Sequence, residues 1–122
     1  MNIFLWILQV LVGLAFIAAG YNHGFNIEKA RTQMVWMKDV PNGLLVFIGI
    51  SEILGGIGLI LPAVTGIMPA LTAWAGTGLA TVMTLAILFH ATRKEYQAIV
   101  VNLVLFALAA FVAYGRFVLV PF

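Results

Sequence analysis

The stretch GLLVFIGISEILGGIGLIL, residues 43–61, carries a single ionisable side chain, Glu52, in an otherwise apolar run. A transmembrane helix needs about 20 such residues to cross the hydrocarbon core of a bilayer. An acid at the centre of a membrane helix costs about 2.5 to 3.5 kcal/mol, and each surrounding leucine or isoleucine returns about 0.3 to 0.6 kcal/mol. We therefore expect this stretch to span a membrane, with the carboxyl group of Glu52 turned inward and bound to a partner or a proton.

The composition extends this expectation to the whole chain. Of its 122 residues, 64% are hydrophobic and 8% are charged, against about 25% charged residues in soluble domains, and the mean hydropathy is +1.14. A bilayer covers that much apolar surface, so lipid is the first predicted partner. The net charge of +2 is not gathered into a basic stripe, so no nucleic-acid surface is predicted. Because it lacks cysteine, the chain itself can form no disulfide and hold no thiolate-ligated cluster.

Apolar runs of membrane-spanning length occur four times, at residues 3–20, 43–61, 68–89 and 98–117. Hydrophobicity does not alternate with a period of two, so the runs predict helices and not the strands of a membrane barrel. The segment from Pro62 through Pro69 is expected to form a short turn between the second and third runs. The chain is thus predicted to be a single membrane domain, residues 1–122, with an all-α fold: a transmembrane four-helix bundle.

The basic residues predict an orientation for these spans. Lys29, Arg31 and Lys38 lie in the first loop, while Arg93 and Lys94 lie in the third. With four spans these two loops share one side of the membrane, and the positive-inside rule places them in the cytoplasm. We expect a cytoplasmic (inner) membrane protein with both termini outside.

The first loop is longer than a helix hairpin requires, and a helical apolar stripe runs through it. Asn26 is a plausible N-cap, Pro41 is a stop signal, and Trp36 suits the level of the lipid headgroups. The pattern predicts a short interfacial helix, serving either as an anchor or as a lid over a ligand entrance. The apolar stripe consists of Ile27, Ala30, Met34 and Met37.

Small residues at helical spacing predict where the spans approach each other. Gly49 and Gly56 share a helix face with Glu52, so this face is expected to meet another helix and not lipid. A second row of small side chains follows the third span in steps of four residues: Thr72, Gly76, Ala80 and Thr84. Such rows favour close packing, within one bundle or between copies of the chain.

The polar residues inside the spans are the candidates for a ligand or proton site. At 1.5 Å per residue, Glu52 lies roughly 13 Å into its span, near the midplane of the bilayer. His90 is expected at the cytoplasmic end of the third span, and Asn102 about one turn into the fourth. A track from His90 through Thr84 and Asn102 to Glu52 fits these depths.

Glu52 and His90 could relay a proton, or bind the carbonyl of a quinone and its reduced hydroxyl, with Asn102 in a positioning role. The alternative is that Glu52 is neutral and only fixes helix packing, and that Asn102 joins two helices. Accessory candidates at compatible depths are His23, Gln9, Thr81 and Thr84.

Motifs for nucleophilic catalysis, phosphate binding and metal coordination are lacking. The two histidines have no spacing that indicates haem, and the glycines of residues 55–58 follow no strand, as a dinucleotide-binding loop would. We therefore predict no catalytic residue and no metal ligand, and whether the chain is an enzyme stays open.

The chain resembles the DoxX-like family of small four-span membrane proteins. The strongest match is residues 48–62, ISEILGGIGLILP in its core, where the family has a glutamate followed by glycines. Residues 11–20, 83–90 and 102–116 resemble the family's other spans. Many members have a lysine shortly after the glycine that ends the first span, whereas this chain has Asn22 and His23 there.

The resemblance implies a redox setting, since the family takes its name from a membrane subunit of a thiosulfate–quinone oxidoreductase, and other members are linked to oxidative-stress complexes. The lack of cysteine argues against sulfur chemistry by this chain. The resulting prediction is a small membrane subunit or anchor of a quinone-linked redox system, associated with a second copy or with a membrane or peripheral protein. The alternatives are a homo-oligomeric carrier or pore for a small solute or proton, and a non-catalytic membrane scaffold.

Overall fold

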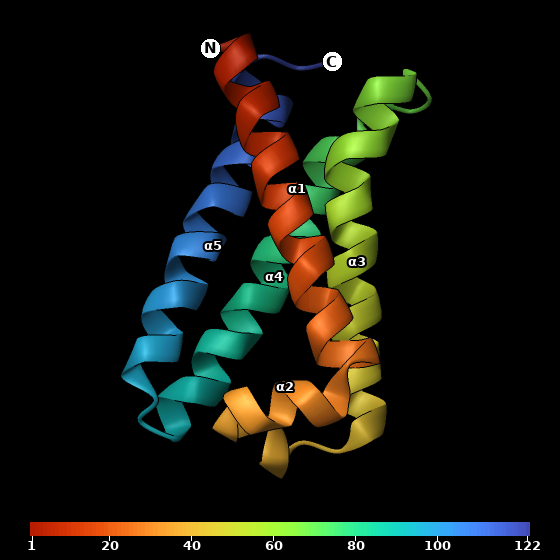
Figure 1. The fold of residues 1–122 in the computed structure, drawn as a ribbon. Coiled ribbons are helices and arrows are strands. Elements are labelled where there is room, and N and C mark those ends of the chain that lie inside the picture. Colours follow the sequence, from red (N-terminus) through yellow and green to blue (C-terminus); the bar gives the residue numbers. More distant parts are fainter.

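The computed structural model describes residues 1–122, which form helices joined by short connections and end in a short non-helical tail (Figure 1). The all-α prediction is confirmed, and four helices are long and apolar enough to cross a membrane: α1, α3, α4, and α5 together with its extension η2. The elements follow the order α1 (Asn2–Phe25), α2 (Ile27–Gln33), the 3-10 helix η1 (Val35–Asp39), α3 (Asn42–Thr65), α4 (Leu71–Thr92), α5 (Tyr96–Tyr114) and the π-helical turn η2 (Gly115–Leu119).

The four long helices form two closely packed pairs, α1 with α3 and α4 with α5. Helices α3 and α4 also pack together, whereas α1 and α5 touch only sparsely. Figure 1 shows the two pairs diverging toward the end where α2 lies. We call this the loop end, and the opposite end, where both termini lie, the termini end.

Glycines allow α1 and α3 to approach each other almost backbone to backbone. A Cβ atom added to Gly49 would lie 2.6 Å from the carbonyl oxygen of Gly20, and one added to Gly56 would lie 2.5 Å from that of Gly13. Real Cβ atoms do not come this close. The prediction that the glycine face carrying Glu52 meets another helix is confirmed, and that helix is α1.

Only some of the small residues on α4 lie in a helix–helix contact. Gly76 packs against Ala109 of α5, and Thr72 is buried, whereas Thr84 is exposed. Between the two pairs lies an apolar core that fills the middle of the bundle: Val12, Phe16, Leu59, Leu79, Met83, Ala109 and Val112.

The turn between α3 and α4 begins later than the sequence indicates. Helix α3 continues through Pro62 to Thr65 and ends at Gly66, whose φ of 72° is left-handed. The N–H of Gly66 donates to the carbonyl oxygen of Pro62 at 3.0 Å. A proline removes one backbone donor but does not by itself end a membrane helix, whereas a glycine in this conformation closes its last turn.

The first loop forms two short helices, α2 and η1, where one was expected. Together they make a strap, residues 27–40, that crosses the loop end of the bundle (Figure 1). Ala30, Met37 and Val40 of the strap are buried in one cluster with Leu45 of α3. The helical stripe read from the sequence therefore faces the bundle.

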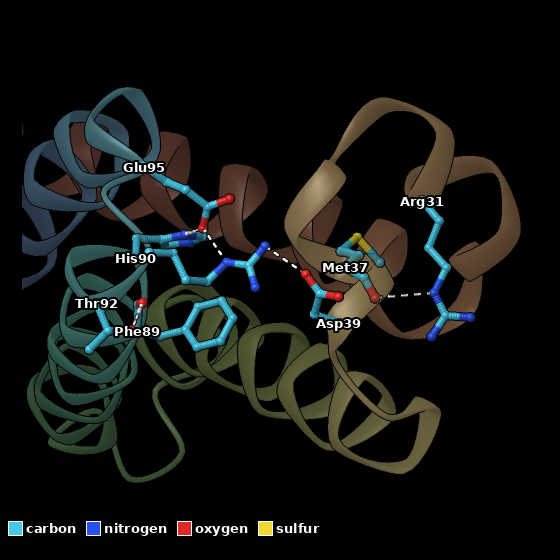
Figure 2. Close-up of polar contacts among 8 residues, drawn as sticks. Arg31, Met37, Asp39, Phe89, His90, Thr92 and Glu95 are labelled. Atoms are coloured by element: carbon cyan, nitrogen blue, oxygen red, sulfur yellow. Dashed lines mark hydrogen bonds and ion pairs between the residues drawn. The ribbon is translucent and has the colours of Figure 1, made fainter.

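One arginine ties the strap to its own backbone. The Arg31 guanidinium donates to the carbonyl oxygens of Met37 at 3.2 Å and Val40 at 3.1 Å, and to Asn42 Oδ1 at 2.6 Å. Figure 2 shows the bond to Met37. These bonds add to the backbone bond that the Val40 N–H donates to the carbonyl oxygen of Met37, and they hold the end of the strap beside the start of α3.

Candidate functional site

The divergence of the helix pairs leaves a cavity of about 990 Å³ at the loop end, roofed by the strap. All four long helices contribute to its wall, and 17 of its 26 lining residues are hydrophobic. Its polar lining includes His23, Ser51, Glu52, His90, Glu95 and Asn102. A large apolar cavity with a few convergent polar groups is the usual form of a small-molecule site.

At the inner wall, Glu52 of α3 contacts His23 near the end of α1. Glu52 Oε1 lies 2.6 Å from His23 Nδ1, a distance at which one of the two atoms donates a hydrogen bond to the other. The Glu52 side chain is 2% exposed and that of His23 16%. The pair forms because Gly20 and Gly24 of α1 pack directly on Gly49, one helical turn from Glu52. The predicted need of the acid for a partner is thus met by His23.

Trp36 of the strap stands between the two histidines. Its ring centroid lies 5.3 Å from that of His23 and 5.3 Å from that of His90, with interplanar angles of 72° and 87°. The indole therefore lines the cavity. A tryptophan in a long loop carries no sequence signal that it will fold inward, since that depends on where the strap crosses the bundle.

His90, at the end of α4, belongs to a polar network that runs outward from the cavity (Figure 2). His90 Nδ1 lies 2.9 Å from Glu95 Oε1. Arg93 Nε donates to the same oxygen at 2.9 Å, and its Nη2 lies 2.7 Å from Asp39 Oδ2 in the strap. The hydrogen bond with His90, together with Arg93, lowers the pKa of Glu95, so this carboxylate is charged at neutral pH.

The Arg93–Asp39 ion pair is an ionic latch between the strap and the α4–α5 turn. Asp39 and Glu95 raise the pKa of the Arg93 guanidinium, which stays charged. This latch went unpredicted because residues 39 and 93 are remote in sequence, and the basic residues of the turn were assigned only a role in orientation.

We expect Arg93→Gln to loosen the strap without unfolding the bundle. Exposed ion pairs stabilise only weakly, so strap opening should become more frequent by roughly 1.5-fold to fivefold. Val40→Cys places the chain's only thiol at a buried strap position, and its rate of maleimide labelling measures this opening. Lys94→Gln in the same Val40→Cys background is the matched control, since Lys94 forms no ion pair. Equal labelling in both variants would show that the latch does not hold the strap.

The other sequence candidates lie apart from the His23–Glu52 pair. Asn102 of α5 lines the cavity. Thr81 and Thr84 are exposed and donate to the carbonyl oxygens of Thr77 and Ala80 on their own helix, outside the cavity. The polar track through Thr84 is therefore not assembled, because a threonine in a helix satisfies its hydroxyl locally.

Gln9 lies at the opposite end of the bundle. Its amide donates to the carbonyl oxygen of Leu59 at 3.0 Å, and its Oε1 accepts from Arg116. Nothing in the structure connects this cluster with the cavity, since the apolar core lies between them.

Metal binding finds no support in the side-chain arrangement. No three histidine, aspartate or glutamate side chains converge in a way that could hold an ion. The two histidines each direct Nδ1 at a carboxylate, and the indole of Trp36 separates their rings.

The cavity opens sideways, between helices. Several residues of its wall are also exposed on the lateral surface of α3, α4 and α5, where lipid would lie: Leu44, Phe47, Leu85, Tyr96 and Val101. This side of the cavity therefore adjoins the apolar surface that lipid would cover.

The comparisons with known proteins agree with this architecture. The family model described as the DoxX-like family matches residues 7–112, a range that includes every polar residue named for the cavity. No curated protein and no solved structure matches the chain. With four membrane-spanning helices and a match over most of its length, the chain belongs to the DoxX-like family of membrane proteins.

Proposed function

We propose that the chain is the membrane subunit of a quinone-linked redox system and that its cavity binds the quinone. The observation that carries the proposal is the laterally open, mostly apolar cavity with the buried His23–Glu52 pair in its wall. A quinone has the matching chemistry, a planar ring with two carbonyl oxygens on an apolar tail. The lateral opening gives the tail a place among the lipids.

Glu52 acts through His23 in this scheme. A carboxylate on Nδ1 fixes the orientation and tautomer of an imidazole. His23 Nε2 is then the atom available to a quinone oxygen, as a donor when the ring is protonated and as an acceptor from the reduced hydroxyl. Asn102 and Trp36 line the same cavity and would border the quinone ring in this scheme.

His90 and Glu95 supply a route to water. Reduction of a quinone to its hydroquinone takes two electrons and two protons, so a buried site needs proton access. His90 lines the cavity and contacts Glu95, whose side chain is 25% exposed at the loop end. Electrons would come from a redox partner protein, in keeping with the role of a membrane subunit.

A pore through one copy of the chain is less well supported. A solute would have to pass from the cavity to the termini end through Phe16, Leu59 and Leu79, which are fully or almost fully buried against one another. The scaffold alternative gives no reason for a cavity of this size beside a buried acid.

Quenching of tryptophan fluorescence tests the proposal. Trp36 is the only tryptophan lining the cavity, so decylubiquinone bound there should quench it saturably, and Trp36→Phe should abolish that component. We expect Glu52→Gln to weaken binding about tenfold, the effect of one lost charge-assisted hydrogen bond. Glu28→Gln, an exposed glutamate in α2, is the matched control and should bind like wild type.

Two results would count against the proposal, the first against quinone binding and the second against the role of the His23–Glu52 pair. One is quenching that rises linearly with decylubiquinone, as simple partition into the micelle would give. The other is saturable quenching of equal affinity in Glu52→Gln and wild type, which would remove the His23–Glu52 pair from the site.

A further inference from the structure

A second polar cluster lies at the termini end, far from the cavity, and centres on Arg116 in η2. Its side chain is almost fully buried, at 4% exposed. Nε donates to Gln9 Oε1, and Nη1 donates to Asn2 Oδ1 at 2.8 Å and to the carbonyl oxygen of Val120 at 3.0 Å. Gly115 lets this turn settle on α1, since an added Cβ would lie 2.5 Å from Leu5.

No carboxylate side chain forms an ion pair with Arg116. All its hydrogen-bond partners are neutral, and its Nη2 is buried without any partner. The four acids lie elsewhere, in the strap, in the α4–α5 turn and beside His23: Glu28, Asp39, Glu95 and Glu52. A guanidinium cannot lose its proton to escape this cost, and a buried charge without a counter-ion is strongly unfavourable.

An apolar groove lies next to this cation on the outer face of α1. It has a volume of about 360 Å³ and is lined only by Trp6, Ile7, Val10 and Leu11. Trp6 joins the two features, because its ring also lies 5.7 Å from the guanidinium carbon of Arg116. The groove therefore begins beside the cation and follows the outer face of α1 from Trp6 to Leu11.

We propose that Arg116 and this groove form a binding site for one glycerophospholipid, with the phosphate on Nη2 and an acyl chain along Trp6 and Leu11. A guanidinium binds a phosphate oxygen through strong charge-assisted hydrogen bonds. The groove favours a lipid over free phosphate, because a lipid has an acyl chain that fills the apolar groove whereas free phosphate has none. The ring of Phe122 lies 4.0 Å from the guanidinium carbon and belongs to no helix, and in this proposal the headgroup takes its place on the guanidinium.

Native mass spectrometry of the delipidated full chain in mild detergent tests this site. Phosphatidylglycerol with two oleoyl chains should be retained as one tightly bound molecule, whereas dioleoylglycerol, which lacks the phosphate, should not. We expect Arg116→Gln to weaken phosphatidylglycerol binding about tenfold to a hundredfold. Arg93→Gln makes the same change at the loop end and should bind like wild type, and Trp6→Ala should weaken retention through the groove.

Three results would overturn the proposal. They are equal retention by wild type and Arg116→Gln, equal retention of dioleoylglycerol and phosphatidylglycerol, and displacement of the lipid by millimolar inorganic phosphate, which would indicate an adventitious ion only. Should Arg116→Gln not fold, the melting temperature of wild type decides the question. The melting temperature of wild type must be higher with phosphatidylglycerol than with dioleoylglycerol. Equal melting temperatures in the two lipids would exclude a phosphate site.

Discussion

Gly49→Val should prevent α1 and α3 from packing and cause the largest loss of stability among single substitutions in the bundle. The new Cβ would meet backbone atoms of Gly20 and Gly24 at 2.6 Å, and backbone cannot rotate away as a side chain can. Overpacking of this kind costs about 3 kcal/mol at the upper end of its usual range, and here separation of the helices also breaks the His23–Glu52 contact. Unfolding in mixed micelles with increasing sodium dodecyl sulfate measures the change.

The matched control is Gly78→Ala in α4, where an added Cβ has no neighbour within 4 Å. That substitution removes only the conformational freedom of a helical glycine, so it should be neutral or stabilise by up to about 1 kcal/mol. A Gly49→Val variant as stable as wild type would mean that the α1–α3 contact is not made through its glycines. The quinone proposal would then lose the geometry on which it depends.

His23→Leu should have the second-largest effect, because it leaves the carboxyl group of Glu52 buried without its partner. Breaking a buried pair from one side costs about 3 kcal/mol or more, whereas replacing both members by apolar residues is often neutral. We therefore expect the double variant His23→Leu with Glu52→Leu to recover most of the stability that His23→Leu loses. The same detergent unfolding, arranged as a double-mutant cycle, measures the coupling between the two residues.

The double variant also shows whether the His23–Glu52 pair contributes to ligand binding or only to stability. If the pair serves a ligand, the double variant should fold well and fail to bind decylubiquinone. A double variant that is stable and binds quinone like wild type would show that the pair contributes only to packing. Additive losses from the two single substitutions would show that Glu52 and His23 do not interact in the folded protein.

The features that could be predicted are those that local sequence dictates. Run length and hydropathy determine the four spans, because an apolar helix of this length satisfies all its backbone groups within its own segment inside lipid. The spacing of Gly49 and Gly56 around Glu52 placed the acid against a helix, because small residues on one face allow close approach whichever helix is the neighbour. The end of α3 was missed, because Pro62 was read as a stop although Gly66 is the residue that closes the helix.

The site itself was decided by tertiary structure. No periodicity relates Glu52 to His23, Arg93 to Asp39, or Arg116 to Gln9, which lie 29, 54 and 107 positions apart in the chain. Their contacts depend on the rotation of each helix about its axis and on the angles at which the pairs cross, and neither is encoded in a single helix. The inward turn of Trp36 depends likewise on the path of the strap. Sequence alone thus determined that the chain crosses the membrane and carries a buried acid, while the packing of distant helices decided which groups meet that acid and where a ligand can enter.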